Sequence, residues 1–320
     1  MKTAQRRKYY SWAKLIEDIK KNSDDTKIYR GQSNDYKTIP PKEFLLPGLP
    51  KELPKNRTAF WPLISSFDRI YKARQYRFSI FLSQQLENNC FNARYRNYPY
   101  SNIKHLSNCG QLERIYYLQH YGVPTCFLDF SKNFLVALYF GISSVKANST
   151  STCDSNENPV FYPNSQIFIS IFEINHKRIH ELLNVKYLEN DFSFMEYGKY
   201  KIAPNRYLAF DLTPIEKCQD KVFNYNLIHQ DGCFVLFDNG GTKVTLDKFI
   251  EDKLNDSKDV SEPVIRIYQL DYNAIFRKED IDEYKNIGLF KYLDLNGKTG
   301  RTLFNDIQGL KYDLNFFHQS

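Results

Sequence analysis

The sequence feature that most constrains the fold is a turn, a strand and a helix that follow one another without interruption in residues 120–143. Gly122 and Pro124 predict a sharp turn at the end of a preceding helix. Residues 125–130 are mostly apolar and β-prone, and they predict a short buried strand. Residues 134–140 are apolar on nearly every face, so they predict a helix at the centre of the fold.

Two polar residues lie where this strand gives way to the helix. An ionised Asp129 is costly to bury beside an apolar helix unless another group pairs with it. Ser131 is a candidate N-cap, because its hydroxyl can accept hydrogen bonds from the free amides of the first helical turn. Both residues therefore fit two interpretations, a helix cap or part of a functional site.

A second candidate site begins at the end of a short strand predicted for residues 27–29. Arg30 follows that strand, and Gly31 is a residue that lets the backbone turn tightly. The planar guanidinium group of arginine matches the geometry of phosphate and carboxylate groups. Arg30 is therefore a candidate anion-binding residue, and the alternative is a surface arginine with an acidic neighbour.

A helix predicted for residues 111–121 leads into the central stretch. Glu113, Tyr117 and His120 fall on one face of this helix at intervals of four and three residues. A carboxylate, a phenol and an imidazole would then point towards the turn. The alternative is a helix surface with ordinary polar residues and one hydrogen-bonded histidine.

The rest of the chain mixes helical and strand patterns without an internal repeat. The predicted elements are a helix starting at Ser11, a strand at 166–172, a short helix capped by Asn175, a hairpin of strands 222–229 and 233–237, a helix at 246–254 and a strand at 264–270. We expect one α+β domain over residues 1–320, with a central, mainly antiparallel sheet flanked by helices. Residues 143–165 are expected to form a flexible insertion and residues 1–10 a basic tail.

Composition narrows the classes of function. The chain has 320 residues, of which 42% are hydrophobic, and a net charge of +7, which suits a nucleic-acid partner without requiring one. The six cysteines lack zinc-site spacing, so no metal site is expected. Without a secretory signal or a long apolar run, we expect a cytoplasmic protein with reduced thiols and no membrane partner.

Several short motifs, taken together, resemble one family, the FRG domain, over roughly residues 12–312. Tyr-Arg-Gly-Gln at 29–32 is similar to the Phe-Arg-Gly-Gln element that names it. Further similar motifs are Gln-His-Tyr-Gly-Val-Pro-Thr at 119–125, Leu-Asp-Phe-Ser at 128–131, Asn226 with Gln-Asp-Gly-Cys-Phe at 230–234, Trp-Pro-Leu at 61–63 with Arg69, and the motif at 303–310.

The resemblance implies a bacterial protein from a phage-defence or toxin–antitoxin context. Its strand-Arg-Gly opening also resembles NAD-dependent ADP-ribosyltransferases, which implies an ADP-ribosyltransferase-like architecture and NAD as cofactor. The expected acceptor is RNA, DNA or a protein, and an antitoxin or chaperone is an expected partner. The alternative function is a non-catalytic sensor module that binds a nucleotide or nucleic acid.

The same resemblance assigns candidate roles to individual residues. The expected NAD-binding residues are Arg30, Gly31, Gln32, Thr125, Ser131 and Gln230. The transferases of this type carry a Glu-x-Glu motif late in the sequence, which stabilises positive charge on the ribose. This chain has no Glu-x-Glu motif, and Gln230 stands at the corresponding place. The expected catalytic residues are therefore Asp129, Glu113 and His120.

Overall fold

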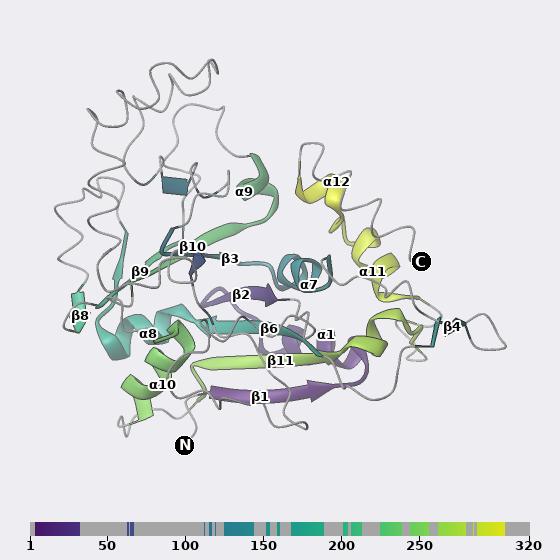
Figure 1. Ribbon diagram of the computed structural model, residues 1–320, viewed down its shortest axis with the longest axis horizontal. Helices are drawn as coiled ribbons and strands as arrows, with labels where there is room; N and C mark the ends of the chain where they lie inside the picture. Colours follow the sequence, from purple (N-terminus) through teal and green to yellow (C-terminus); the bar gives the residue numbers. More distant parts are fainter. Residues whose placement is uncertain are drawn as a thin grey trace, which may run out of the picture.

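The computed structural model describes residues 4–32, 63, 65–66, 112, 115–116, 119, 125–143, 152–153, 159–160, 168–188, 201–203, 206–212, 225–238, 244–255, 262–279, 284 and 287–304. These residues form a large β-sheet with helices packed against it (Figure 1). The expected α+β class is therefore confirmed.

The sheet has nine strands in the order β1-β11-β6-β2-β3-β10-β9-β7, with β8 paired to β9. The strands are β1 (Ala4–Tyr9), β2 (Lys27–Gln32), β3 (Phe127–Ser131), β6 (Phe168–Asn175), β7 (Lys186–Tyr187), β8 (Lys201–Ala203), β9 (Arg206–Asp211), β10 (Gly232–Asp238) and β11 (Ile265–Asp271). Only the β1–β11 and β7–β9 pairs are parallel, which confirms a mainly antiparallel sheet. A separate two-stranded sheet joins β4 (Thr152–Cys153) and β5 (Pro159–Val160).

The helices follow the expected apolar patterns in most places. They are α1 (Trp12–Asn22), α7 (Phe134–Ser143), α8 (His176–Leu183), α9 (Tyr225–His229), α10 (Leu246–Asn255), α11 (Leu289–Leu295), α12 (Gly300–Leu303) and the 3-10 helix η3 (Tyr272–Phe276). Ser11 caps α1 and Asn175 caps α8, each by accepting a hydrogen bond from a backbone amide of the first turn. The sequence predicted the helix start at Ser11 and the cap at Asn175 correctly.

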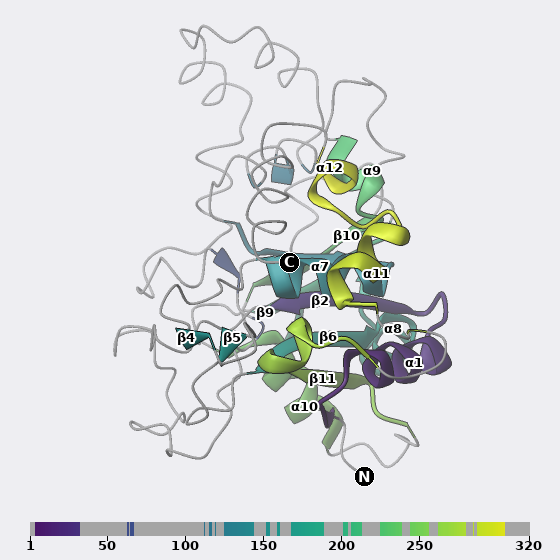
Figure 2. The ribbon, with the colours of Figure 1, turned by 90° about the vertical axis from the view of Figure 1, so that its right-hand side faces the viewer.

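Two hydrophobic clusters cover opposite faces of the sheet, because successive side chains of a strand point to opposite sides. On one face, Tyr29 and Ile171 pack with α1, α7, α11 and α12. On the other face, Ile28 and Phe172 pack with α8 and α10. Figure 2 shows α11 beside α7, and the ring of Phe140 in α7 lies 5.7 Å, between centroids, from that of Phe304, directly after α12.

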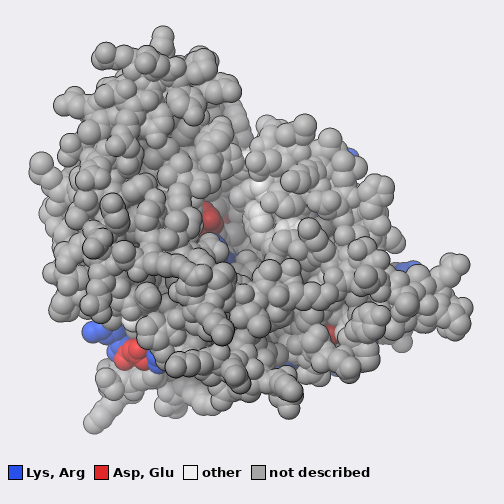
Figure 3. Space-filling view, in the orientation of Figure 1, with Lys and Arg blue, Asp and Glu red and all other residues white. Residues whose placement is uncertain are grey.

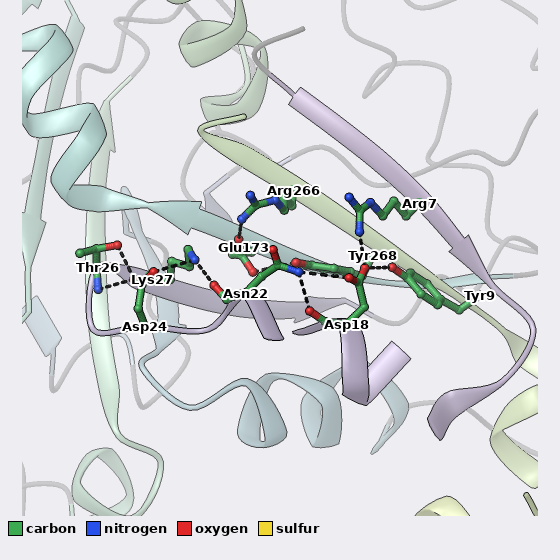
Figure 4. A network of polar contacts seen from close by, with 10 residues as sticks. All are labelled: Arg7, Tyr9, Asp18, Asn22, Asp24, Thr26, Lys27, Glu173, Arg266 and Tyr268. Atoms are coloured by element: carbon green, nitrogen blue, oxygen red, sulfur yellow. Dashed lines mark hydrogen bonds and ion pairs between the residues drawn. The ribbon is translucent and has the colours of Figure 1, made fainter. Parts of the chain in front are cut away.

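The first residues of the chain form an edge strand, which corrects the expectation of a basic tail at residues 1–10. β1 pairs with β11 from Ala4 to Tyr9. Asp18 of α1 accepts hydrogen bonds from Arg7, at 2.5 Å, and from the hydroxyl of Tyr9 (Figure 4). These bonds lower the pKa of Asp18 although burial opposes this. The basic residue Arg7 thus helps to hold α1 against the edge of the sheet.

A buried carboxylate lies on β6, the third strand from this edge. Glu173 of β6 is 2% exposed and accepts hydrogen bonds from Arg266, at 2.6 Å, and from the Tyr268 hydroxyl, at 2.9 Å (Figure 4). Burial and the adjacent Glu173 raise the pKa of Tyr268, so the phenol keeps the proton that it donates. The charge of Glu173 is thereby paired, as a buried carboxylate requires.

One predicted element is wrong. The sequence predicted a strand at 222–229, whereas residues 225–229 form α9 and the turn at 230–232 joins this helix to β10. Asp231 adopts a left-handed backbone with φ of 47°, which ends the helix and starts the strand. The apolar side chains of α9 are spaced so closely that the short run fits either a strand or one helical turn.

Some expected segments fall outside the residues that the structure describes. They include most of the helix predicted for residues 111–121 and the part of the motif at 303–310 that follows Phe304. Within the expected insertion at 143–165, the structure describes the last residue of α7 and strands β4 and β5.

Candidate functional site

The candidate site lies where strands β2 and β3 part. These strands pair through Tyr29 and Ser131 alone, whereas β2 pairs with β6 along its whole length. Beyond that pair, the backbone carbonyl of Asp129 accepts a hydrogen bond from Nη1 of Arg30, at 2.5 Å. The Arg30 side chain therefore bonds a backbone carbonyl of β3 at a place where β2 and β3 no longer pair. We call this place, between the two central strands of the sheet, the polar gap.

Gly31 continues β2 instead of turning, which corrects the expected tight turn. A Cβ atom at this position would lie 1.7 Å from the carbonyl oxygen of Ala137 and 2.6 Å from the amide nitrogen of Gly141. The absence of a side chain lets α7 lie directly against β2. Close helix packing is thus a sufficient structural reason for glycine after Arg30.

The side chain of Asp129 is 63% exposed and is held from two sides. Its Oδ1 accepts a hydrogen bond from the side-chain amide of Gln119, at 2.5 Å. Its Oδ2 lies 3.8 Å from Nη1 of Arg30, which is an ion-pair distance and too long for a hydrogen bond. Asp129 therefore does not cap α7, and its carboxylate is a fixed, solvent-facing negative charge beside a guanidinium group.

Thr125 anchors the residue that holds this carboxylate. Its hydroxyl donates to the side-chain oxygen of Gln119 and accepts from the backbone amide of Phe127, at 3.2 Å. Its own amide donates to the hydroxyl of Ser66, at 3.0 Å. Thr125 is 2% exposed, so in this arrangement it positions Gln119.

A second polar network joins β3 to the turn before β10. The hydroxyl of Ser131 donates to the backbone carbonyl of Gln230, at 2.6 Å, and accepts from the amide of Asn133, at 2.9 Å. The side chain of Asn133 accepts from the amide of Leu135, at 3.0 Å, so Asn133 caps α7 in place of the expected Ser131. The side-chain amide of Gln230 donates to the carbonyl of Leu303, at 3.0 Å.

The structure thus divides the predicted site residues. Arg30, Asp129 and Thr125 share one network, and Ser131 and Gln230 belong to the second. Gln32 lies on β2, two residues after Arg30, and Glu113 and His120 lie outside the described residues. Sequence reasoning singled out neither Gln119 nor Asn133, although Gln119 opens the motif at 119–125.

The charged side chains of described residues that are visible in Figure 3 lie in small groups, and acidic and basic atoms adjoin each other near the centre of the face shown. Among the residues that the structure describes, no group of three or more His, Cys, Asp or Glu side chains is arranged to hold a metal ion. The helices traced in the described ranges include none with the length and apolarity needed to cross a membrane.

Fold and site together define an α+β protein with a polar gap at the centre of its main sheet. Comparison with known families adds that residues 56–150 match the family model of the FRG domain. The match agrees with the FRG resemblance over this segment, which holds the Trp-Pro-Leu motif at 61–63 and the motifs at 119–125 and 128–131. Asp129, Gln119 and α7 lie inside the matched segment, whereas Arg30 precedes it. No curated protein and no solved structure matches the chain.

Proposed function

We propose that this protein is an NAD-dependent ADP-ribosyltransferase. The observation that carries the proposal is the Arg30–Asp129 pair in the gap between β2 and β3. In the proposed complex, Arg30 binds the diphosphate of NAD through charge-assisted hydrogen bonds. Asp129 then faces the ribose that carries nicotinamide.

The chemistry of the reaction requires a group of this kind. The bond between nicotinamide and C1′ of the ribose breaks, and nicotinamide leaves with the electron pair. Positive charge develops on the sugar until a nucleophile of the acceptor bonds to C1′ and loses its proton. A fixed carboxylate stabilises that charge more than it stabilises the bound substrate, and such preorganised charges are among the largest catalytic effects.

Gln119 contributes by fixing the carboxylate. Its amide binds Oδ1 of Asp129 at 2.5 Å, so the carboxylate does not need to reorient during the reaction. Oδ2 of Asp129 is the oxygen that faces the ligand in this proposal.

The acceptor and the biological role are part of the proposal. A net charge of +7 favours an RNA or DNA acceptor, because polyanions are attracted to basic proteins. ADP-ribosylation of such a target would act as a toxin in phage defence, and an antitoxin partner would restrain it.

A second candidate function is a non-catalytic module that binds a nucleotide or nucleic acid. The existing hydrogen bonds favour it, because Arg30 already bonds a backbone carbonyl and Gln119 already bonds Asp129. The amide of Gln230 also bonds Leu303. These contacts are those of a structural network that would recognise a ligand without reacting with it.

The test is incubation of the full chain with NAD labelled on its adenylate, together with cell lysate, total RNA or DNA. We expect release of nicotinamide and transfer of the label, and a loss of at least about 100-fold in rate for Asp129→Asn. The matched control is Asp252→Asn, which changes an aspartate of similar exposure, 54%, on α10.

The outcomes separate the candidate functions. Nicotinamide release without transfer of the label indicates NAD hydrolysis. Binding of NAD without release, lost in Arg30→Ala and retained in Asp129→Asn, indicates the binding module. Absence of both binding and release contradicts the use of NAD.

A further inference from the structure

The outermost strand of the main sheet, β1, has an open edge within the described part of the chain. β1 pairs with β11 from Ala4 to Tyr9 and is the last strand at that end of the sheet (Figure 1). Successive residues of a strand turn their backbone N–H and C=O groups to alternate sides, so about half of these groups in β1 point away from β11. Among the described residues, no strand pairs with that side. A strand edge of this kind is a template for the addition of another strand.

The side chains along this edge are basic and alternate between the two faces of the sheet. Arg6 and Lys8 lie on the face that α10 covers, where Nη2 of Arg6 is 3.9 Å from Glu251 of α10. This distance is too long for a hydrogen bond, and the side chain of Arg6 is 49% exposed. Arg7 lies on the other face, where its guanidinium is paired with Asp18 at 2.5 Å. The two faces therefore differ in how far their positive charge is already neutralised.

Lys8 is held by an aromatic ring. Its Nζ lies 5.0 Å from the centroid of the Phe168 ring, which is a cation–π contact, and the residue is exposed. Such a contact orients the ammonium group without neutralising its charge. Arg6 and Lys8 thus place two positive charges on one side of the open edge, at positions about 7 Å apart along the strand.

These charges decide which strand fits the edge. A second copy of β1 would bring its own three consecutive basic residues against them, and like charges directly opposite one another destabilise a strand pair. A strand with carboxylates at alternate positions converts the same charges into attraction, because directly opposite side chains lie about 4.5–5.5 Å apart. The residues between the carboxylates should be uncharged, since Arg7 already pairs with Asp18.

We propose that the open edge of β1 binds an extended segment of a partner protein that carries Asp or Glu at every second position. Backbone hydrogen bonds add the segment to the sheet as a further strand, and Arg6 and Lys8 select its carboxylates. The inference does not depend on the reaction proposed above, because β1 lies at the end of the sheet and the Arg30–Asp129 pair lies on its central strands.

The experiment measures the fluorescence anisotropy of labelled peptides with the full chain. The probe is a six-residue peptide, the length of β1, in which glutamate and threonine alternate. A peptide of alternating lysine and threonine is the charge control. Two further versions of the acidic peptide carry N-methyl groups on either the glutamate or the threonine amides, because one of these two sets faces β1 in an added strand. We expect saturable binding of the acidic peptide, no binding of the basic peptide, and loss of binding in one of the two methylated versions.

A pair of double variants separates the edge from the net charge of the protein. Arg6→Gln combined with Lys8→Gln should weaken binding of the acidic peptide at least about 5-fold, because two opposite-charge pairs are lost. The matched control combines Lys177→Gln and Lys186→Gln, which remove the same charge from exposed positions on α8 and β7. The control should bind the peptide as the wild-type protein does. Circular dichroism checks that both double variants are folded.

Each remaining outcome overturns the proposal. An equal loss in the two double variants shows attraction by net charge, and equal affinity of both methylated peptides and the unmodified one shows that no strand is added. Absence of binding of the acidic peptide contradicts the proposed partner. Light scattering tests the other occupant, since a wild-type dimer that becomes a monomer in Arg6→Gln with Lys8→Gln would mean that a second copy occupies the edge.

Discussion

Replacing Gly31 by alanine tests whether α7 depends on close contact with β2. The added Cβ would lie 1.7 Å from the carbonyl oxygen of Ala137, and real contacts of this kind are not shorter than about 3.0 Å. The carbonyl must therefore withdraw by at least about 1.3 Å. Because the contact is with helix backbone, no side-chain rotation relieves it, and α7 or β2 must shift as a unit.

The cost follows from what α7 packs against. Seven of the ten residues of α7 are buried, and a radial gap of about 0.5–1 Å already forfeits a quarter to a half of the dispersion energy of a contact. Overpacked cores usually lose about 1–3 kcal/mol. We expect Gly31→Ala to lie at the upper end, with a loss of about 3 kcal/mol in the free energy of unfolding.

The assay is urea unfolding followed by circular dichroism, with Gly288→Ala as the matched control. A Cβ at Gly288 meets no atom within 4 Å, and the φ of −81° suits alanine. The control should therefore change stability by no more than about 0.5 kcal/mol. If Gly31→Ala unfolds within that same margin of the wild-type protein, the proposed packing of α7 on β2 is refuted.

Three further substitutions test local features by the same unfolding assay. Asn133→Ala should cost about 1 kcal/mol because it removes the cap of α7, and Asn133→Ser should recover most of it; equal stability of the two variants would contradict the cap. Tyr116→Phe should lower the free energy of unfolding by about 1.5–3 kcal/mol, since the Tyr116 hydroxyl donates to the carboxylate of Asp211, which is 1% exposed. An unchanged urea midpoint would show that this bond adds no stability. Burial lowers the pKa of His176 below its usual value of about 6.5, so the unfolded state binds more protons than the folded state. The free energy of unfolding therefore falls as the pH drops from about 7.5 to 5.5. His176→Gln should reduce that fall, and an identical pH profile of the variant and the wild-type protein would contradict the assignment.

Part of the candidate site could be predicted because its residues stand at the ends of elements with clear patterns. Asp129 and Arg30 were singled out from a strand-to-helix junction and a strand end, and the structure places them in one network. Their pairing could not be derived from the sequence, because they are 99 residues apart and the register of β2 and β3 decides it. Gln119 was missed for the same reason, since its role depends on the carboxylate of Asp129, which it contacts only in the folded chain.

The sequence by itself determined the elements whose signals are local. The apolar run of α7, the caps at Ser11 and Asn175 and the apolar strand β6 depend on neighbours within a few residues, where periodicity and capping chemistry act. Tertiary structure decided the position of β1, a basic segment that becomes a strand because β11, some 260 residues later, supplies its hydrogen-bonding partner. It also decided the polar gap between β2 and β3. The point at which two strands stop pairing depends on the tertiary packing around them, and the sequence pattern of either strand does not predict it.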